Sequence, residues 1–287
     1  MTKKHQLLAF IVALIWGTNF VVIRYGLDEL PPFLFAAIRF FLVVFPLIFF
    51  VTKPKANWLL IAAYGVLIGF GQFGLVYLAM QNDITPGLAS LVLQMQVFFS
   101  IVLALLFFKE SVSLIQWIAL VISFSGIGLI ASNVDGHTTT RGLILILIAA
   151  TSWALGNMVV KKAGKVDIIA FLVYSSLFSV PMLAAMSFYF EGWTLIKTSL
   201  QSASMTSVWV VLWQTIGNTL VGYGIWNFLL NQYSAAIVTP WSLLVPVFGM
   251  LASFLLLGES MQAWKLVAAS LILLGLAMNI YTSKIKI

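Results

Sequence analysis

Ten long apolar stretches, separated by short polar breaks, constrain this chain more than any other feature. Of its 287 residues, 62% are hydrophobic and 8% are charged, whereas about a quarter of the residues in a soluble domain are charged. Each stretch approaches the roughly 20 residues that a bilayer-spanning helix needs. The sequence therefore predicts an all-α polytopic membrane protein. Its ten transmembrane helices are expected at 7–22, 33–51, 58–80, 88–108, 114–131, 143–160, 168–190, 207–230, 236–257 and 266–281.

The two halves of the chain repeat each other. WGTNFVVIR at 16–24 is matched by WALGNMVVKK at 153–162, so Asn19 and Asn157 precede the same pair of valines. ASLVLQMQVFFSIVLALLFFKES at 89–111 is matched by VTPWSLLVPVFGMLASFLLLGES at 238–260. We therefore expect one five-helix repeat over 1–135 and a second over 142–287. Because five is odd, the second repeat is inverted in the membrane, an arrangement typical of transporters.

The basic residues predict the orientation, because cytoplasmic loops are enriched in lysine and arginine. With a cytoplasmic N-terminus, one side of the membrane has only Arg24, Arg141, Lys197 and Lys265. The other side collects Lys3, Lys4, Lys53, Lys55, Lys109, Lys161, Lys162, Lys165, Lys284 and Lys286. Both termini are therefore expected in the cytoplasm. Because this distribution explains the formal net charge of +7, no nucleic-acid partner is expected.

Arg39 is the ionisable side chain that lies clearly within a predicted span, whereas Glu110, Glu259, Asp83 and Asp167 lie at span ends or in loops. A charge in hydrocarbon is costly, so such a residue is a functional candidate. It lies about 9 Å from the start of its span, at roughly 1.5 Å per residue, which is within reach of the interface for a snorkelling arginine. Arg39 is either a structural anchor or a group that binds a carboxylate.

Two tryptophan–asparagine pairs occupy matching places in the two halves. Trp16 and Asn19 are three residues apart, and Trp153 and Asn157 are four apart, so each pair shares one face of a helix. Matching positions of inverted repeats meet near the middle of the bilayer. The pairs either converge on one central cavity, or each asparagine hydrogen-bonds the backbone of a neighbouring helix while the tryptophans belong to an interfacial aromatic belt.

Polar side chains also mark the fourth and eighth spans. Gln94 follows Ser90 by one helical turn, whereas Gln96 points elsewhere, so we expect at least one of the two glutamines to join helices rather than line a cavity. The eighth span carries Gln214, Asn218, Tyr223, Trp226 and Asn227.

The sequence offers little for catalysis or metal binding. Cysteine is absent, and the two histidines, His5 and His137, lie in the terminus and in a loop. No nucleotide-binding or nucleophile motif occurs in a suitable context. LVGYG at 220–224 resembles a potassium filter, but it lies within one apolar span and is not repeated. We therefore expect no enzyme activity, no cofactor and no metal.

The chain resembles the drug/metabolite transporter superfamily, EamA type. The resemblance covers essentially the whole chain and rests on two inverted five-span halves, a WGxNF first helix and a fourth span that ends in KES. It is strongest to the bacterial O-acetylserine/cysteine exporter branch, through WGTNFVVIRYGL (16–27), GLASLVLQMQVFF (87–99), VGYGIW (221–226) and SLLVPV (242–247).

The resemblance implies an inner-membrane exporter of small amino-acid metabolites that works by alternating access through a central cavity between the repeats. By matching position it assigns to substrate binding Trp16, Asn19, Gln94, Gln96, Trp153, Asn157, Tyr223 and Trp241. We add Arg39 to these candidates because its charged side chain lies within a predicted span.

Two departures from other members narrow the expected substrate. Small multidrug members carry a first-span glutamate for proton exchange, and this chain has Asn19 in that span. Phosphate-sugar members carry a basic cluster, and only Arg39 is clearly buried here. A zwitterionic or neutral solute therefore fits best, and export of apolar drugs or other small metabolites is the alternative. The oligomeric state does not follow from the sequence.

Overall fold

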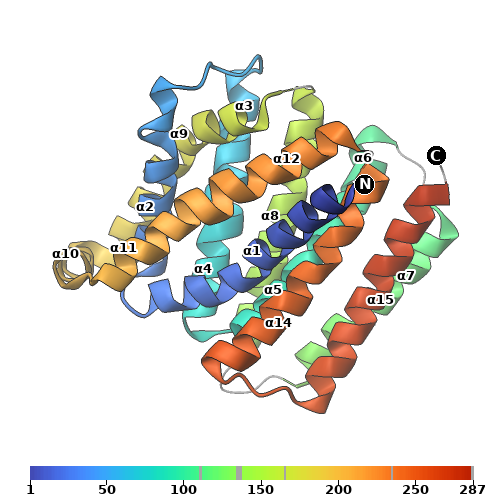
Figure 1. The fold of residues 1–287 in the computed structure, drawn as a ribbon. Helices are drawn as coiled ribbons and strands as arrows, with labels where there is room; N and C mark the ends of the chain where they lie inside the picture. The colour runs from blue at the N-terminus through green and yellow to red at the C-terminus, as the bar shows by residue number, and fades with distance from the viewer. Residues whose placement is uncertain (110–111, 134–137, 165, 234, 286–287) are drawn as a thin grey trace.

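The protein is a bundle of long helices (Figure 1). The computed structural model describes residues 1–109, 112–133, 138–164, 166–233 and 235–285, and these residues form helices and connecting loops without a strand. Glu110, His137, Lys165 and Lys286, considered above, lie outside the described residues.

Helices of the first half follow one another with short connections. They are α1 (Lys3–Leu27), α2 (Pro32–Val44), η1 (Leu47–Phe49), α3 (Trp58–Gly65), η2 (Val66–Gly74), α4 (Leu75–Asn82), α5 (Pro86–Val92), η3 (Leu93–Met95), α6 (Gln96–Phe108) and α7 (Leu114–Ala131). The segment η2 is π-helical and joins α3 to α4 in one rod, whereas η3 is a 3₁₀ turn between α5 and α6.

The second half has the same succession of rods. Its helices are α8 (Thr140–Ala163), α9 (Ile168–Met186), η4 (Ser187–Glu191), α10 (Gly192–Ser202), α11 (Met205–Leu212), η5 (Trp213–Val221), α12 (Gly222–Gln232), α13 (Ala235–Val238), η6 (Thr239–Leu243), α14 (Leu244–Leu257) and α15 (Ala263–Ile285). Its third rod also contains a π-helical segment, η5, and its fourth a 3₁₀ segment, η6.

Eight helical runs of the described chain are long and apolar enough to cross a membrane, and the apolar run Trp241–Leu257 is shorter. The rod from α11 to α12 is not among the eight, because polar residues such as Gln214 and Asn218 lower its mean hydropathy. Large apolar side chains on the outer surface, including Phe49 and Trp209, suit contact with lipid. The all-helical, polytopic prediction is confirmed, while the count of ten and the inversion remain predictions.

Local sequence explains where several helices begin. The side chain of Asp167 accepts hydrogen bonds from the backbone of Ile169 and Ala170 at the start of α9, and Ser113 forms a capping box with Gln116 at the start of α7. The first turns of α2 and α5 contain proline, whose missing N–H is not needed there. These caps matter in a bilayer, where an unpaired backbone donor is costly.

Most extensive helix contacts pair one half with the other. Helix α1 packs on α14, α2 on α9, α6 on α8, and α7 on α15, and the last pair lies side by side at one edge of the bundle (Figure 1). The contact between α1 and α14 depends on Gly17, where a Cβ would lie 2.5 Å from the Cβ of Phe248 and 2.6 Å from the carbonyl oxygen of Val245. Small residues allow such close approach between membrane helices.

Gly17→Val should lower the stability of the protein by about 1–3 kcal/mol, because overpacking a close contact costs that much. Gly128→Val is the matched control, since a Cβ at that helical glycine would meet no atom within 4 Å. Thermal unfolding in detergent checks this, and equal midpoints for the two variants would contradict the close contact.

Candidate functional site

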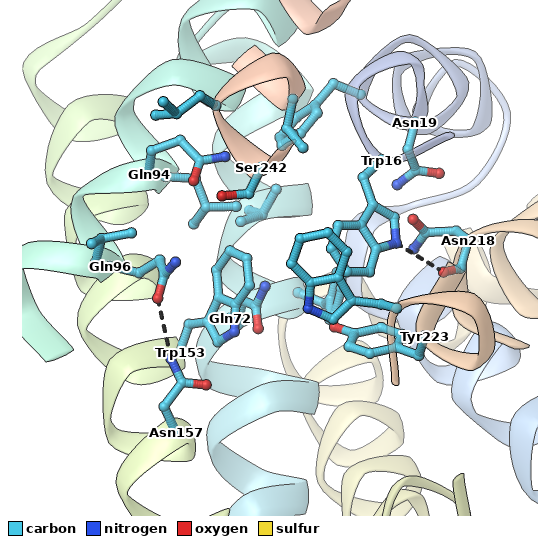
Figure 2. Close-up of a pocket in the computed structure, with 18 of the residues that line it drawn as sticks. Trp16, Asn19, Gln72, Gln94, Gln96, Trp153, Asn157, Asn218, Tyr223 and Ser242 are labelled. Atoms are coloured by element: carbon cyan, nitrogen blue, oxygen red, sulfur yellow. Dashed lines mark hydrogen bonds between the residues drawn. The ribbon is translucent and has the colours of Figure 1, made fainter. Parts of the chain in front are cut away.

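A cavity of about 520 Å³ lies between the two halves, and Figure 2 shows the side chains that converge on it. Its polar and aromatic lining comes from both halves. These side chains are Trp16, Asn19, Phe20, Tyr64, Gln72, Phe73, Gln94, Gln96, Trp153, Asn157, Asn218, Tyr223, Trp226, Ser242 and Asn279. None of them is ionised at neutral pH, so the lining itself is uncharged.

The structure brings seven of the nine predicted site residues to this cavity. They are Trp16, Asn19, Gln94, Gln96, Trp153, Asn157 and Tyr223. Arg39 and Trp241 are not among the lining residues. Whether the seven bind a substrate remains a prediction that the geometry favours.

Trp16 is held at the cavity wall by the other half of the chain. Its indole nitrogen donates to the backbone oxygen of Asn218 at 3.3 Å, and its ring lies 5.3 Å from that of Tyr223 and 5.2 Å from that of Trp226. A Cβ at Gly222 would lie 2.5 Å from the indole nitrogen. The glycine before Tyr223 therefore lets the Trp16 ring approach the backbone of α12.

The two asparagines line the cavity and also join helices, through side chains rather than through the helix backbone that the second interpretation expected. The Oδ1 atom of Asn19 accepts from Nε2 of Gln214 at 2.8 Å. The amide nitrogen of Asn157 donates to Oε1 of Gln96 at 3.1 Å and to the hydroxyl of Ser100 at 3.3 Å. Each bond crosses from one half to the other and orients an amide beside the cavity.

Gln94 and Gln96 line the same cavity, which an unbroken helix would not allow equally. In an α-helix residues two apart are about 160° apart around the axis, whereas in a 3₁₀ segment they are about 120° apart. Gln94 lies in the 3₁₀ turn η3. The turn therefore brings the two side chains closer to a common face, and Gln96 also forms the expected bond between helices.

Arg39 is buried inside the bundle and does not snorkel to the interface. The residue is 1% exposed. The two terminal nitrogens of its guanidinium donate to the hydroxyls of Tyr77 and Thr219, each at 3.0 Å. The guanidinium carbon lies 3.8 Å from the centre of the Phe73 ring. Arg39 thus lies behind the cavity wall rather than on it, because these partners hold it inside the bundle.

Trp241 is not among the residues that line the cavity. It contacts a small apolar cluster around Ala9, Leu229 and Val238, and the next residue, Ser242, lines the cavity instead. Whether Trp241 binds a substrate stays a prediction.

Several cavity residues were missed or not selected from the sequence, notably Gln72, Asn218, Trp226 and Ser242. Gln72 is 2% exposed, and its Oε1 atom has no hydrogen-bond partner among the described residues. A glutamine between glycines in an otherwise apolar span, GFGQFG at 69–74, is the signal that could have identified it.

The described residues contain no cluster of three or more histidine, aspartate or glutamate side chains suited to a metal ion. The cavity wall instead combines amides with aromatic rings. Such a wall can orient a small polar solute by hydrogen bonds and pack its apolar part.

Comparison with known proteins agrees with this geometry. The sequence profile of the EamA-like transporter family matches residues 3–132 and again 140–281. The chain is 38% identical to a probable amino-acid metabolite efflux pump of Salmonella typhimurium, over 100% of this chain and 98% of that protein. It is 37% identical to a probable amino-acid metabolite efflux pump of Escherichia coli, over 98% and 96% of the two chains.

A solved structure, titled "Crystal structure of protein", covers 99% of both chains with a TM-score of 0.65 and 15% identity. At that identity the likeness concerns the fold alone. It places the whole chain, rather than one half, in a fold already known from a crystal.

Because the chain has no cysteine, single cysteines can map the cavity without a background. A thiol at Asn157→Cys should react readily with a small water-soluble thiol reagent, since Asn157 lines the cavity. Ser176→Cys, at a position 0% exposed within α9, is the control and should stay unmodified. Equal labelling rates at the two positions would contradict a wet cavity at Asn157.

Proposed function

We propose that this chain, which belongs to the EamA-like transporter family, exports small amino-acid metabolites across the bacterial inner membrane. The cavity between the halves is the observation that carries this proposal. It is about 520 Å³ in volume, and both halves contribute its uncharged amides and aromatic rings. Relatives named as probable amino-acid metabolite efflux pumps support the same substrate class, and O-acetylserine or cysteine is the expected solute.

The transport mechanism we propose is alternating access, because the two ends of the bundle differ. The loops that contain Asp28, Asp83 and Glu259 lie at one end (Figure 1), which we call the acidic end. The cavity reaches toward the opposite end, where Val160 and Ile168 line it close to the ends of α8 and α9. With both termini cytoplasmic, this conformation is closed toward the periplasm and accessible from the cytoplasm.

The acidic end is closed by bonds between the halves. Glu259 of the second half accepts from the Thr85 hydroxyl at 2.5 Å and from the Gly87 N–H at 3.1 Å, both in the first half. Glu259 also forms a buried ion pair with Lys265, at 3.0 Å. Opening this end would separate Glu259 from α5, so the carboxylate acts as a latch.

Two further carboxylates of the first half reach the second half at the same end. Asp83 lies 3.1 Å from the guanidinium of Arg141. Glu29 accepts from the hydroxyls of Ser207 at 2.5 Å and Ser204 at 2.7 Å. These hydrogen bonds, that of Ser207 most of all, hold the pKa of Glu29 below its usual range. The Glu29 carboxylate therefore stays ionised, and the contact persists, in a moderately acidic medium.

Proteoliposomes loaded with labelled O-acetylserine, cysteine, a panel of other amino acids and cationic dyes test the function. We expect release of amino acids well above that from protein-free vesicles loaded in the same way. Failure of every amino acid would contradict the proposal, and release of the dyes alone would favour an exporter of apolar drugs.

Asn157→Leu and Asn19→Leu should each lower kcat/KM for the transported amino acid roughly fivefold, the worth of one neutral hydrogen bond of about 1 kcal/mol. Asn133→Leu, outside the cavity, is the matched control and should leave transport unchanged. Transport rates are normalised to the amount of folded protein. Unchanged kinetics in both cavity variants would assign these asparagines to packing alone.

Glu259→Gln should weaken the latch, because it leaves Lys265 without its buried counter-ion. We expect an impermeant thiol reagent applied at the acidic end to label Asn157→Cys faster in this background. Asp28→Asn is the control, since its pair with Arg24 is exposed and worth little. A labelling rate that Glu259→Gln leaves unchanged would contradict the latch.

A further inference from the structure

Arg39 carries a positive charge that no acidic group of the described chain neutralises. The ion pairs found there join Arg24 to Asp28, Arg141 to Asp83, and Lys265 to Glu259. Arg39 has only the neutral hydroxyls of Tyr77 and Thr219 and two aromatic rings around it. Burial of an uncompensated charge costs free energy. An anionic group that binds nearby during transport would offset this cost.

The charge is one aromatic ring away from the cavity. The Phe73 ring lines the cavity, and its centre lies 3.8 Å from the guanidinium carbon of Arg39. The Nε atom of Arg39 has no hydrogen-bond partner among the described residues. The wall around Phe73 is therefore the positive side of a cavity whose own lining is neutral.

Gln72 offers the opposite polarity beside this wall. It precedes Phe73 in the π-helical segment η2 and also lines the cavity, and Figure 2 shows its amide among the converging side chains. Its Oε1 atom is buried without a donor among the described residues. A buried acceptor oxygen that has no donor suits an ammonium group, which brings three N–H donors. π-Helical turns often occur at functional sites, where they redirect neighbouring side chains.

We infer that η2 selects zwitterionic substrates. The α-ammonium group of the substrate binds Oε1 of Gln72. Its α-carboxylate lies beside Phe73, where the positive charge of Arg39 attracts it. Arg39 is here a selectivity residue that acts through Phe73, without touching the solute. This inference rests on the proposed function and adds the substrate's charge pattern to it.

A structural role for Arg39 makes a different prediction. If Arg39 only anchors the fold, its replacement should change the affinity for every ligand alike. If its positive charge acts on the substrate, the replacement should change the affinity only for ligands that carry the carboxylate. At an effective dielectric constant of about 20 and a separation of about 8 Å, the attraction corresponds to roughly a 30-fold change in affinity. Selectivity among matched ligands therefore separates the two roles.

Three ligands that differ in one group each provide the test: O-acetylserine, its methyl ester, which lacks the carboxylate, and N,O-diacetylserine, which lacks the ammonium. Binding is measured through the ligand-induced rise in the unfolding temperature of the purified full chain, which also reports whether each variant folds. We expect the wild type to bind O-acetylserine at least tenfold more tightly than either analogue.

In Arg39→Gln, the affinity for O-acetylserine should fall to that for the methyl ester, while the ester is bound as before. Arg39→Lys, which keeps the charge, should restore part of the preference. Gln72→Met should remove the preference over N,O-diacetylserine only. Gln201→Met, a change of the same kind at an exposed position of α10 outside the cavity, should remove neither preference.

Equal weakening of all three ligands by Arg39→Gln would overturn the inference, as would a Gln72→Met variant that keeps its ammonium preference. A wild type that binds the three ligands equally would overturn the inference and leave the proposed function standing. A wild type that neither binds nor transports any amino acid would overturn both.

Discussion

A polar side chain inside a bilayer needs a partner, and around the cavity of this protein several of these partners lie on the opposite half of the chain. Asn19 of the first half accepts from Gln214 of the second, and Asn157 of the second donates to Gln96 of the first. Trp16 reaches the backbone of Asn218 across the same boundary. These bonds position the cavity wall and hold the halves together, so separating the halves would also dismantle the site.

The sequence predicted much of this arrangement because the repeat places equal residues at equal depths. One of the two interpretations of the sequence placed Trp16 with Asn19, and Trp153 with Asn157, on one cavity, and all four line it. Helical periodicity was less reliable where the helix is irregular: the 3₁₀ turn η3 brings Gln94 and Gln96 to one surface, and π-helical η2 carries the unselected Gln72. Periodicity assumes one twist along a span, and these segments change it.

Contacts that depend on tertiary packing could not be predicted. The depth of Arg39 in its span suggested snorkelling, but Tyr77 and Thr219 hold its guanidinium inside the bundle. Glu259 was placed correctly at a span end, yet its role in joining the halves appears only when α5 is seen beside it. The number of spans depends on the short run Trp241–Leu257 and on the rod from α11 to α12, where polar residues such as Asn218 line a cavity.

The account depends on one central claim, that the solute occupies the cavity between the halves. The most direct measurement is ligand protection: the rate at which a thiol reagent modifies Asn157→Cys, recorded with increasing O-acetylserine, which has no thiol of its own. The account predicts that saturating O-acetylserine slows the modification, with a concentration dependence that matches its binding affinity. An unchanged rate in a variant that still binds and transports O-acetylserine would place the substrate elsewhere and contradict the account.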